Sequence, residues 1–450
     1  MMQNKAQQIG LQPLEFKGLS SIEATFEFGR TPLEFCRRCA DEYEDAVCLN
    51  VAGTKTYLFN HPALIDEVLN KQEPSCIKDY SYRALKDIFG EGLLLSHGDT
   101  WKTHRKLIQW AFSSDRLNNY AKQIVMHTDS MLKNWRANEV YNVQREMSLL
   151  TAKIIMQAMF GVDATQSAAI IVDALNIIQL QYLHRAKNWY LLPNWLPTLE
   201  NWRTYRAKKK LDELVYKIIE QRRKTPHDDL LSMLDGSDDV RLSDKQLRDE
   251  VLTLLVAGHE TTASVLTWTL MLLAQHPEVE AKLVTEVRSV LGERLPTVED
   301  RPHLKYTEMV LKESMRLYPP AWILGRELIR DCNIGGYELS CGSVIYFSQW
   351  AIHRDARFFS DPEQFNPDRW QDNLEQRLPR CVYFPFGAGA RVCIGKALSM
   401  MEATLILAMV VRQFRLTLAS DLPIEPLPSF TLRPKNGLLM NIVDTQSFKK

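Results

Sequence analysis

The ten residues FGAGARVCIG, from Phe386 to Gly395, place one cysteine in a glycine-framed loop at the start of an apolar helical pattern. Gly389 and Gly395 lack side chains where a large planar group could approach the backbone. Backbone N–H groups at the start of a helix favour a negatively charged sulfur. Arg391 can meet a carboxylate, and Phe386 can shield the sulfur. The loop therefore predicts a thiolate ligand at Cys393, and a buried structural cysteine is the alternative interpretation.

The composition is that of an ordinary globular protein. Hydrophobic residues make up 45% of the chain and charged residues 24%. Lys+Arg and Asp+Glu number 55 each, so no net field favours nucleic acid. Chains of 450 residues usually form two or three domains, but no Gly/Ser-rich or Pro-rich linker divides this one. We therefore expect a single domain over residues 1–450.

The N-terminus is polar, and no apolar stretch of the chain is long enough to span a bilayer. The eight cysteines are scattered without the rhythm of a disulfide scaffold, which suits a reducing cytoplasm. Cys36 and Cys39 have the spacing of half a zinc site, but no second pair follows, so we interpret them as structural. These features predict a cytoplasmic protein without a transmembrane anchor.

Helical patterns dominate most of the chain. A β-rich N-terminal part over about residues 30–70 contains a helix at 32–43 and a hairpin at 47–59, and a helical part follows over about 75–450. Residues 75–95 are expected to form a long loop. Short strands are expected near 324–347 and 416–443. The helices are expected at 62–69, 100–112, 116–134, 143–160, 170–186, 198–223, about 244–276, 277–291, 306–317 and 395–414. The fold class is therefore mainly α with a smaller β-rich region.

The predicted central helix contains the segment AGHETT, from Ala257 to Thr262. Its flanks are almost continuously apolar, which indicates a buried helix. Gly258 lowers helix stability, and a buried carboxylate at Glu260 beside a hydroxyl at Thr261 requires a role. A solvated helix face with a tolerated glycine is the alternative.

The pattern Phe-x-x-Gly-x-Arg-x-Cys-x-Gly, continued by Ala397 and Glu402, resembles the haem-binding loop of the cytochrome P450 superfamily. The resemblance covers the chain from about Pro32 to its end. It implies a cytochrome P450 fold, with haem between the long central helix and the cysteine-bearing loop. Residue spacing alone would predict only a helix-rich protein with a thiolate-bound metal. Five landmarks occur in the family's order: Trp101/Arg105, Gly258–Thr262, Glu313/Arg316, Pro367/Arg369 and the cysteine loop.

The resemblance assigns roles to individual residues. Cys393 becomes the ligand of haem b, Glu260 the acid and Thr261 the alcohol that relay protons during oxygen activation, and Gly258 the opening for dioxygen. His259 falls at a variable position, so we interpret it as structural. The residues implied to contact the haem or its propionates are Trp101, Arg105, Arg326, Phe386, Arg391 and Gly395. Glu313, Arg316 and Arg369 are implied to be scaffold, with Trp370 where the family more often has phenylalanine.

The family's substrate pocket corresponds to mostly apolar positions in this chain. They are Tyr82, Phe89, Leu254, Ala257, Trp322, Ile323, Leu324 and Leu438. Several of these side chains could instead pack the core. The pocket is expected to take a hydrophobic molecule such as a fatty acid, a terpenoid or a retinoid-like chain.

The leading hypothesis is a haem-thiolate monooxygenase that hydroxylates or epoxidises such a substrate with dioxygen. Its NAD(P)H-derived electrons would come from a separate ferredoxin or flavodoxin with its reductase, and the protein would be a monomer. A peroxide-using hydroxylase or an isomerase of the same fold is one alternative, and a non-catalytic haem sensor is another. The aromatic bend of Trp189, Tyr190, Trp195 and Trp202 could cap the pocket or touch a membrane surface.

Overall fold

The computed structural model describes residues 14–15, 21–43, 45–51, 53–83, 85–188, 198–225, 227–236 and 242–444. The chain forms two compact units, each built from three separate stretches of sequence. Unit 1 comprises Met1–Ala84, Ile323–Pro362 and Leu378–Val392. Unit 2 comprises Leu85–Trp322, Glu363–Arg377 and Cys393–Lys450.

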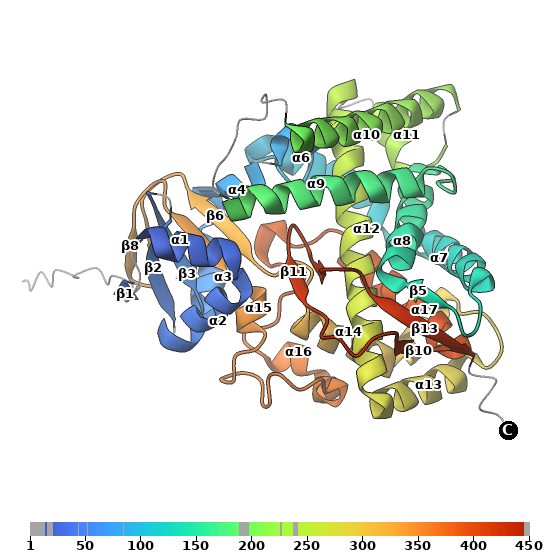
Figure 1. Cartoon of the computed structure of the whole chain (residues 1–450). Coiled ribbons are helices and arrows are strands. Elements are labelled where there is room, and N and C mark those ends of the chain that lie inside the picture. The colour runs from blue at the N-terminus through green and yellow to red at the C-terminus, as the bar shows by residue number, and fades with distance from the viewer. Residues whose placement is uncertain are drawn as a thin grey trace, which may run out of the picture. The chain divides into compact units, whose positions relative to one another are not determined.

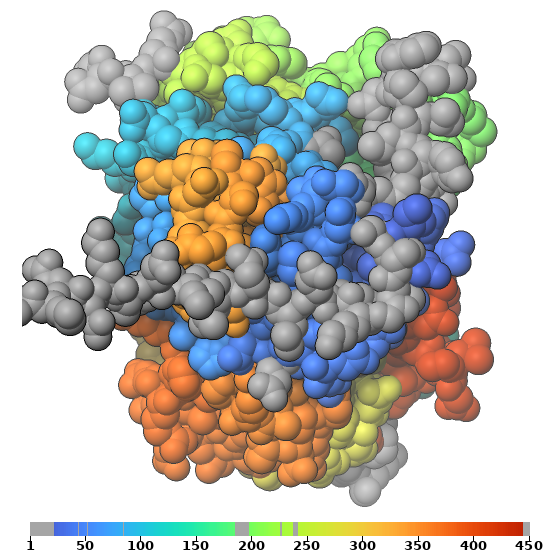
Figure 2. Space-filling view, turned by 90° about the vertical axis from the view of Figure 1, so that its left-hand side faces the viewer, coloured from blue at the N-terminus to red at the C-terminus, as the bar shows by residue number. Residues whose placement is uncertain are grey.

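Unit 1 is built around a six-stranded sheet with the strand order β1-β2-β3-β9-β6-β4. The hairpin of β2 and β3 turns at Gly53, whose φ of +84° is a conformation that glycine adopts readily, and it confirms the hairpin predicted for 47–59. Strand β3 then pairs in parallel with β9, so segments far apart in the sequence lie side by side (Figure 1). The space-filling view shows blue atoms of the N-terminal stretch directly beside orange atoms of the later stretch of unit 1 (Figure 2). The strands are β1 Leu14–Glu15, β2 Ala46–Val51, β3 Thr54–Phe59, β4 Cys76–Ile77, β6 Leu324–Leu328 and β9 Val344–Phe347.

The remaining elements of unit 1 are short. The expected helix at 32–43 is α2, and α1 was not predicted. These elements are α1 Ser21–Arg30, α2 Pro32–Tyr43, α3 Pro62–Asp66, α4 Tyr80–Arg83, α15 Gln349–Ile352, and the hairpin of β7 Cys332–Ile334 and β8 Tyr337–Leu339. The loop before the cysteine ends in a 3-10 turn at Gly389–Arg391.

Unit 2 is mainly helical, as the sequence predicted. Its helices are α5 Lys86–Phe89, α6 Gly98–Gln109, α7 Ser114–Asn134, α8 Val143–Phe160, α9 Ala168–Asn188, α10 Leu199–Lys224, α11 Leu230–Gly236, α12 Asp244–Gln275, α13 Pro277–Leu291, α14 Lys305–Leu317, α16 Leu374–Arg377 and α17 Lys396–Gln413. A three-stranded sheet of β10 Phe414–Leu418, β13 Leu439–Asp444 and β5 Val140–Asn142, and a hairpin of β11 Pro426–Pro428 and β12 Leu432–Pro434, complete it.

The long helix α12 is the axis of unit 2 (Figure 1). Ser243 and Gln246 form a capping box at its start, which supplies acceptors to the otherwise unpaired backbone donors. Its apolar residues pack against α8, α14 and α17. Helix α17, which begins three residues after Cys393, is buried along almost its whole length. The two apolar patterns that flank the predicted chemistry therefore form one packed helical core.

The structure corrects the expectation of a long loop over residues 75–95. This segment contains β4, α4 and α5, because tertiary contacts stabilise pieces too short to show periodicity. Asp79, for example, accepts hydrogen bonds from the backbone N and the hydroxyl of Ser81 at 2.8 and 2.5 Å and so starts α4. The aromatic bend predicted at Trp189, Tyr190 and Trp195 lies outside the described residues.

Candidate functional site

Cys393 lies between the 3-10 turn of the loop and the start of α17, and the residue is exposed. Protein atoms nevertheless surround the thiol closely, and this desolvation raises its pKa. A backbone hydrogen bond from Gly395 and the positive charges of Arg105 and Lys396 act in the opposite direction. The surroundings of Cys393 thus combine access to the sulfur with three interactions that favour a thiolate.

Helix α6 carries two of the predicted cofactor contacts on one face. The Arg105 guanidinium lies 5.7 Å from the centre of the Trp101 ring, and Trp101 is largely buried. Burial lowers the pKa of Arg105, and the charge of Cys393 raises it. The structure therefore brings Arg105 into electrostatic contact with the predicted ligand.

Arg326 and Arg391 lie in the same electrostatic environment in unit 1. Burial lowers the pKa of Arg326, and the repulsion by Arg391 lowers it further. Among the described residues, Arg326 donates to the carbonyl oxygen of Gly325 at 2.9 Å, whereas Arg391 pairs with Glu73 at 3.1 Å. Buried cations that repel one another are costly unless an anion meets them. This arrangement fits a cofactor carboxylate.

A third cation, Lys78, belongs to this cluster and was missed by the sequence analysis. Its side chain is buried, and burial together with the charges of Arg326 and Arg391 holds its pKa well below the usual value. Its Nζ lies 4.5 Å from the centre of the Tyr82 ring, and no carboxylate of the described residues forms an ion pair with it. A single lysine outside any motif gave no signal in the sequence.

The structure describes the surroundings of three predicted positions at the cysteine loop. Gly389 has a φ of +71°, and a Cβ atom there would lie 2.1 Å from the carbonyl oxygen of Leu69. The close approach of Leu69 within unit 1 therefore requires a glycine at this position. Phe386 is half-buried. At Gly395 a Cβ atom would lie 3.9 Å from the sulfur of Cys393.

Helix α12 has one open face in its otherwise buried middle. From residue 247 to residue 273, every residue is buried except Ala257, Gly258 and Thr261. These three positions share one side of the helix because they are spaced i, i+1 and i+4. The Thr261 hydroxyl donates to the carbonyl oxygen of Ala257 at 2.7 Å. The predicted alcohol therefore lies on the face of α12 that other side chains leave open.

Gly258 also has a packing role that the sequence did not reveal. A Cβ atom at this position would lie 2.6 Å from Cδ1 of Ile155 on α8. The missing side chain therefore lets α8 and α12 approach each other closely. The predicted role of Gly258 as an opening for dioxygen stays a prediction.

Glu260 is buried and lies beside three polar residues. Its Oε1 accepts a 3.0 Å hydrogen bond from the Thr431 hydroxyl, and its Oε2 lies 3.6 Å from Nε2 of His259. The pKa of the buried Arg433 is lowered by desolvation and raised by the charge of Glu260. Thr431 and Arg433 were missed because they follow Glu260 by more than 160 residues in sequence.

The interpretation of His259 as a structural residue stays a prediction. It is buried, its Nδ1 lies 2.9 Å from the Leu255 carbonyl oxygen, and burial lowers its pKa. The carbonyl oxygen of His259 accepts a hydrogen bond from the Thr151 hydroxyl of α8.

The predicted substrate residues of unit 2 lie in different parts of that unit. The ring of Phe89 lies 6.3 Å from that of Phe430, and the indole of Trp322 donates to the carbonyl oxygen of Ser429 at 2.9 Å. Residues 429–431 therefore connect these side chains with Glu260, and Phe430 is an additional candidate. Leu438 is instead tied through its backbone to β5 and to the start of α8. Leu254 is buried on α12, one turn before the open face.

The remaining predicted substrate residues belong to unit 1. Tyr82 lies under the Lys78 ammonium group and is half-buried. Ile323 and Leu324 lie at the start of β6 and are half-buried. The substrate role of these three residues stays a prediction.

The predicted scaffold network is present in unit 2. Glu313 and Arg316 are fully buried on α14, with Arg316 Nη2 and Glu313 Oε1 2.8 Å apart. Arg369 Nε lies 2.8 Å from the same oxygen. This buried network fixes the segment around residue 369 to α14.

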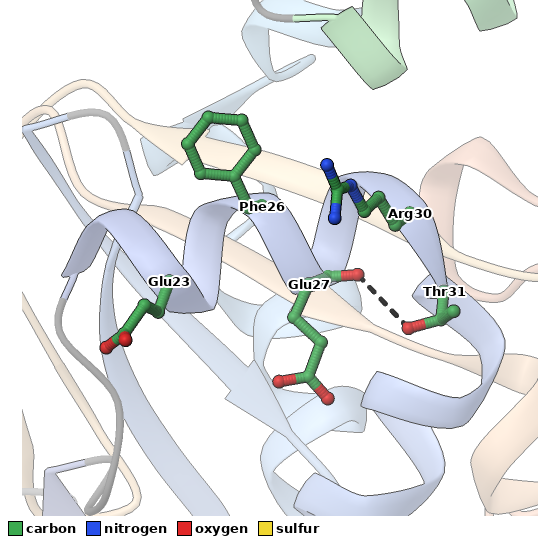
Figure 3. A pocket seen from close by; sticks show the side chains of 5 residues that line it. All are labelled: Glu23, Phe26, Glu27, Arg30 and Thr31. Carbon is green, nitrogen blue, oxygen red and sulfur yellow. Dashed lines mark hydrogen bonds between the residues drawn. The ribbon is translucent and has the colours of Figure 1, made fainter.

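A separate hollow of about 460 Å³ lies on α1 and is lined by Glu23, Phe26, Glu27, Arg30 and Thr31 (Figure 3). It is open to solvent, and a single helix with the residue after it provides its walls. No residue singled out in the sequence lines it, so we do not consider it the candidate site.

None of the helices in the described ranges is long and apolar enough to cross a lipid bilayer. All eight cysteines lie among the described residues, and all are free thiols.

Comparison with known proteins gives concordant matches over most of the chain. A family model described as Cytochrome P450 matches residues 15–441. The chain is 34% identical to cyclooctatin synthase of Streptomyces melanosporofaciens, over 90% of this chain and 88% of that protein. It is 32% identical to cyclooctat-9-en-7-ol 5-monooxygenase of the same organism, over 91% and 88%. It is also 32% identical to pentalenene oxygenase of Streptomyces avermitilis, over 90% and 91%.

Proposed function

Because this chain belongs to the cytochrome P450 family and is an oxidoreductase of the monooxygenase type, we propose that Cys393 ligates haem b and that a hydrophobic molecule is hydroxylated or epoxidised. The haem-thiolate cofactor, which the family implies, activates dioxygen when it is bound. One oxygen atom enters a C–H or C=C bond of the substrate, and two electrons and two protons reduce the other to water. The main support is Cys393, an exposed residue whose sulfur lies beside Arg105 and the Gly395 N–H.

Two sets of residues suit a cofactor with carboxylates. Trp101 and Arg105 lie with Cys393 in unit 2, and Arg326, Arg391 and Lys78 form a cation cluster within unit 1. Each set would neutralise a carboxylate by charge-assisted hydrogen bonds. The family resemblance assigns Phe386 and Gly395 to the cofactor as well, and Gly395 places no side chain against the Cys393 sulfur.

Glu260 and Thr261 would deliver the protons that the reaction consumes. The Thr261 hydroxyl lies on the open face of α12, where it donates to the carbonyl oxygen of Ala257. To deliver a proton it would turn from this carbonyl towards the bound oxygen and be reprotonated. Glu260 is held by Thr431 and attracted by Arg433, so its carboxylate is fixed beside that face. A peroxide-using enzyme or a haem sensor would not need this pair, which supports a dioxygen-dependent monooxygenase.

The proposed substrate is a terpenoid. Two relatives are named for acting on cyclooctat-9-en-7-ol and pentalenene, and this favours terpenoids over the fatty acids and retinoid-like chains that the pocket residues also admit. The electrons would come from NAD(P)H through a separate ferredoxin or flavodoxin and its reductase. The eight free thiols support a cytoplasmic location, and we propose a monomer.

The test is reconstitution of the holoenzyme with a ferredoxin or flavodoxin, its reductase and NAD(P)H under isotopically labelled dioxygen. A panel of terpenoids and fatty acids serves as substrates. We expect a terpenoid product that contains one labelled oxygen atom. A product whose oxygen comes only from water or added peroxide would contradict the proposal.

A further inference from the structure

Three consecutive charged residues near the start of α12 lie in the protein interior. Arg248, Asp249 and Glu250 are only 6%, 2% and 0% exposed. Burying such groups costs free energy unless each of them is paired, and apolar side chains would fill the same space at a lower cost. The contacts of these residues therefore need an explanation beyond packing.

Each of the three residues holds the backbone of one segment, residues 88–93, which begins with the last two residues of α5 and which we call the 88–93 loop. Arg248 donates through Nη2 to the carbonyl oxygen of Ile88 at 2.7 Å. The backbone N–H of Glu91 donates to Oδ2 of Asp249 at 3.0 Å. Arg248 and Asp249 also pair with each other at 2.8 Å, so the two anchors stabilise one another.

Glu250 holds the end of the 88–93 loop and a second element at the same time. Its Oε2 accepts a 3.0 Å hydrogen bond from the backbone N–H of Leu93. Its Oε1 lies 2.5 Å from Nδ1 of the buried His104 on α6. Helix α6 also carries Trp101 and Arg105. One carboxylate therefore connects the loop with the helix that bears the proposed cofactor contacts.

The glycines of the loop show how closely it follows α12. A Cβ atom at Gly90 would lie 2.0 Å from the Asp249 carboxyl carbon. A Cβ atom at Gly92 would lie 2.3 Å from Oγ1 of Thr253 and 2.5 Å from the backbone oxygen of Asp249. No side chain fits between loop and helix, so the position of the loop is set by α12.

A further ion pair extends the same cluster to α10. Nε of Arg248 lies 2.8 Å from Oδ1 of Asp212, which belongs to α10. Charged side chains of α12 thus join the loop to α6 and α10. The loop itself carries Phe89, whose ring faces Phe430.

We propose that Arg248, Asp249 and Glu250 are positioning residues that fix Phe89 in the substrate site, and that His104 couples this position to α6. This inference rests on the proposed function, since it assigns Phe89 to the substrate pocket. It predicts that displacing the 88–93 loop weakens binding in the pocket without removing the cofactor.

The variant Gly92→Ala tests the inference without changing any charged residue. The matched control is Gly236→Ala, because a Cβ atom at Gly236 meets nothing within 4 Å. The probes are 4-phenylimidazole, which binds haem iron and places a phenyl ring in the pocket, and imidazole, which lacks the ring. In Gly92→Ala we expect the dissociation constant of 4-phenylimidazole to rise about tenfold. The constant for imidazole should change by less than about twofold, and Gly236→Ala should match the wild type for both probes.

Amide hydrogen exchange at Glu91 and Leu93 provides an independent measurement, and it is made on the variants Glu250→Ala and Glu250→Gln. Glu250→Ala leaves Leu93 N–H without its acceptor, so its exchange should quicken about tenfold or more. Glu250→Gln keeps an acceptor oxygen and should restore most of the protection. The control Glu280→Gln alters a glutamate of α13 that pairs with Arg415, and it should leave both amides unchanged.

The outcomes separate this inference from the proposed function. A wild-type protein without a thiolate-ligated haem spectrum would overturn the proposed function. A Gly92→Ala protein that keeps this spectrum and binds 4-phenylimidazole as tightly as the wild type would overturn the positioning role alone. Unchanged exchange of Leu93 in Glu250→Ala would also contradict it. If Glu250→Ala does not fold, Gly92→Ala decides the question.

Discussion

The indole nitrogen of Trp370 donates a 2.8 Å hydrogen bond to Oε2 of Glu313, a carboxylate that is completely buried. Arg316, Arg369 and the backbone N–H of Asn366 donate to the same carboxylate. Phenylalanine, which is more usual in the family at the position of Trp370, has no N–H to offer. In this chain the tryptophan therefore contributes one more donor to a buried charge.

Replacing this donor should lower stability. Trp370→Phe removes a hydrogen bond to a buried carboxylate and should reduce the free energy of unfolding by about 1.5–3 kcal/mol. Chemical denaturation of the haem-loaded protein measures the change. Trp202→Phe, at an exposed site on α10, is the control and should have little effect. Equal stability of the two variants would show that the indole bond contributes nothing.

A second buried carboxylate, Glu402, lies on α17 and should make stability depend on pH. Burial raises the pKa of Glu402 to about 8, and a hydrogen bond with Thr262 opposes the shift. In the unfolded chain this glutamate has its ordinary pKa of 4.5. Between that pH and about 8, the unfolded chain has released the proton while the folded protein still holds it. The stabilisation is complete below the unfolded pKa and is lost as the pH rises towards 8.

Glu402→Gln removes this titration and keeps the shape of the side chain. Between pH 5 and pH 8 the wild type should lose roughly 3–4 kcal/mol of unfolding free energy that the variant retains. Denaturation at the two pH values measures the difference. The control is Glu278→Gln on the exposed side of α13. Parallel pH profiles of the wild type and Glu402→Gln would contradict a raised pKa.

Thr261→Ala should separate oxygen consumption from product formation. The hydroxyl lies on the open face of α12, and without it proton delivery should fail more often, so the product formed per NAD(P)H should fall about tenfold. Peroxide should rise correspondingly. Thr267→Ala is a matched control, because Thr267 makes the same 2.7 Å bond to the carbonyl oxygen four residues earlier but is fully buried. Equal coupling in both variants would remove Thr261 from the mechanism.

Lys78→Met has opposite effects under two interpretations of the cation cluster. If Lys78 meets a haem carboxylate, its loss should speed haem transfer to an acceptor protein about tenfold, since a buried charge-assisted bond is removed. If no anion binds there, removing the repulsion by Arg326 and Arg391 should only stabilise the apoprotein. Lys71→Met, at an exposed position, is the control.

The sequence was most informative where one physical pattern governed a long segment. The helices at 32–43, 143–160 and 277–291 were predicted with the bounds that the structure has, because apolar periodicity and caps such as Pro277 agree there. The short pieces between residues 75 and 95 could not be found in this way. Their conformations depend on Asp79, Asp249 and Glu250, partners that act through the folded chain.

The same distinction applies to the candidate site. Motif residues such as Cys393 and Thr261 could be named because their neighbours in sequence carry the signal. Lys78, Phe430 and Thr431 could not, since each becomes a candidate only through residues distant in sequence, and Thr431 is 171 positions from Glu260. Gly258 could be named from its motif, but its second role could not. Only the structure shows that this glycine permits the close packing of Ile155 against α12.

The absorbance spectrum of the reduced, haem-loaded protein with carbon monoxide tests the central claim most directly. We predict the red-shifted Soret band of cysteine-thiolate ligation for the wild type and for Cys341→Ser, which alters another exposed cysteine. In Cys393→Ser this band should be lost. A thiolate band that persists in folded Cys393→Ser protein, or a histidine-like band in the wild type, would contradict the assignment of Cys393 as the haem ligand.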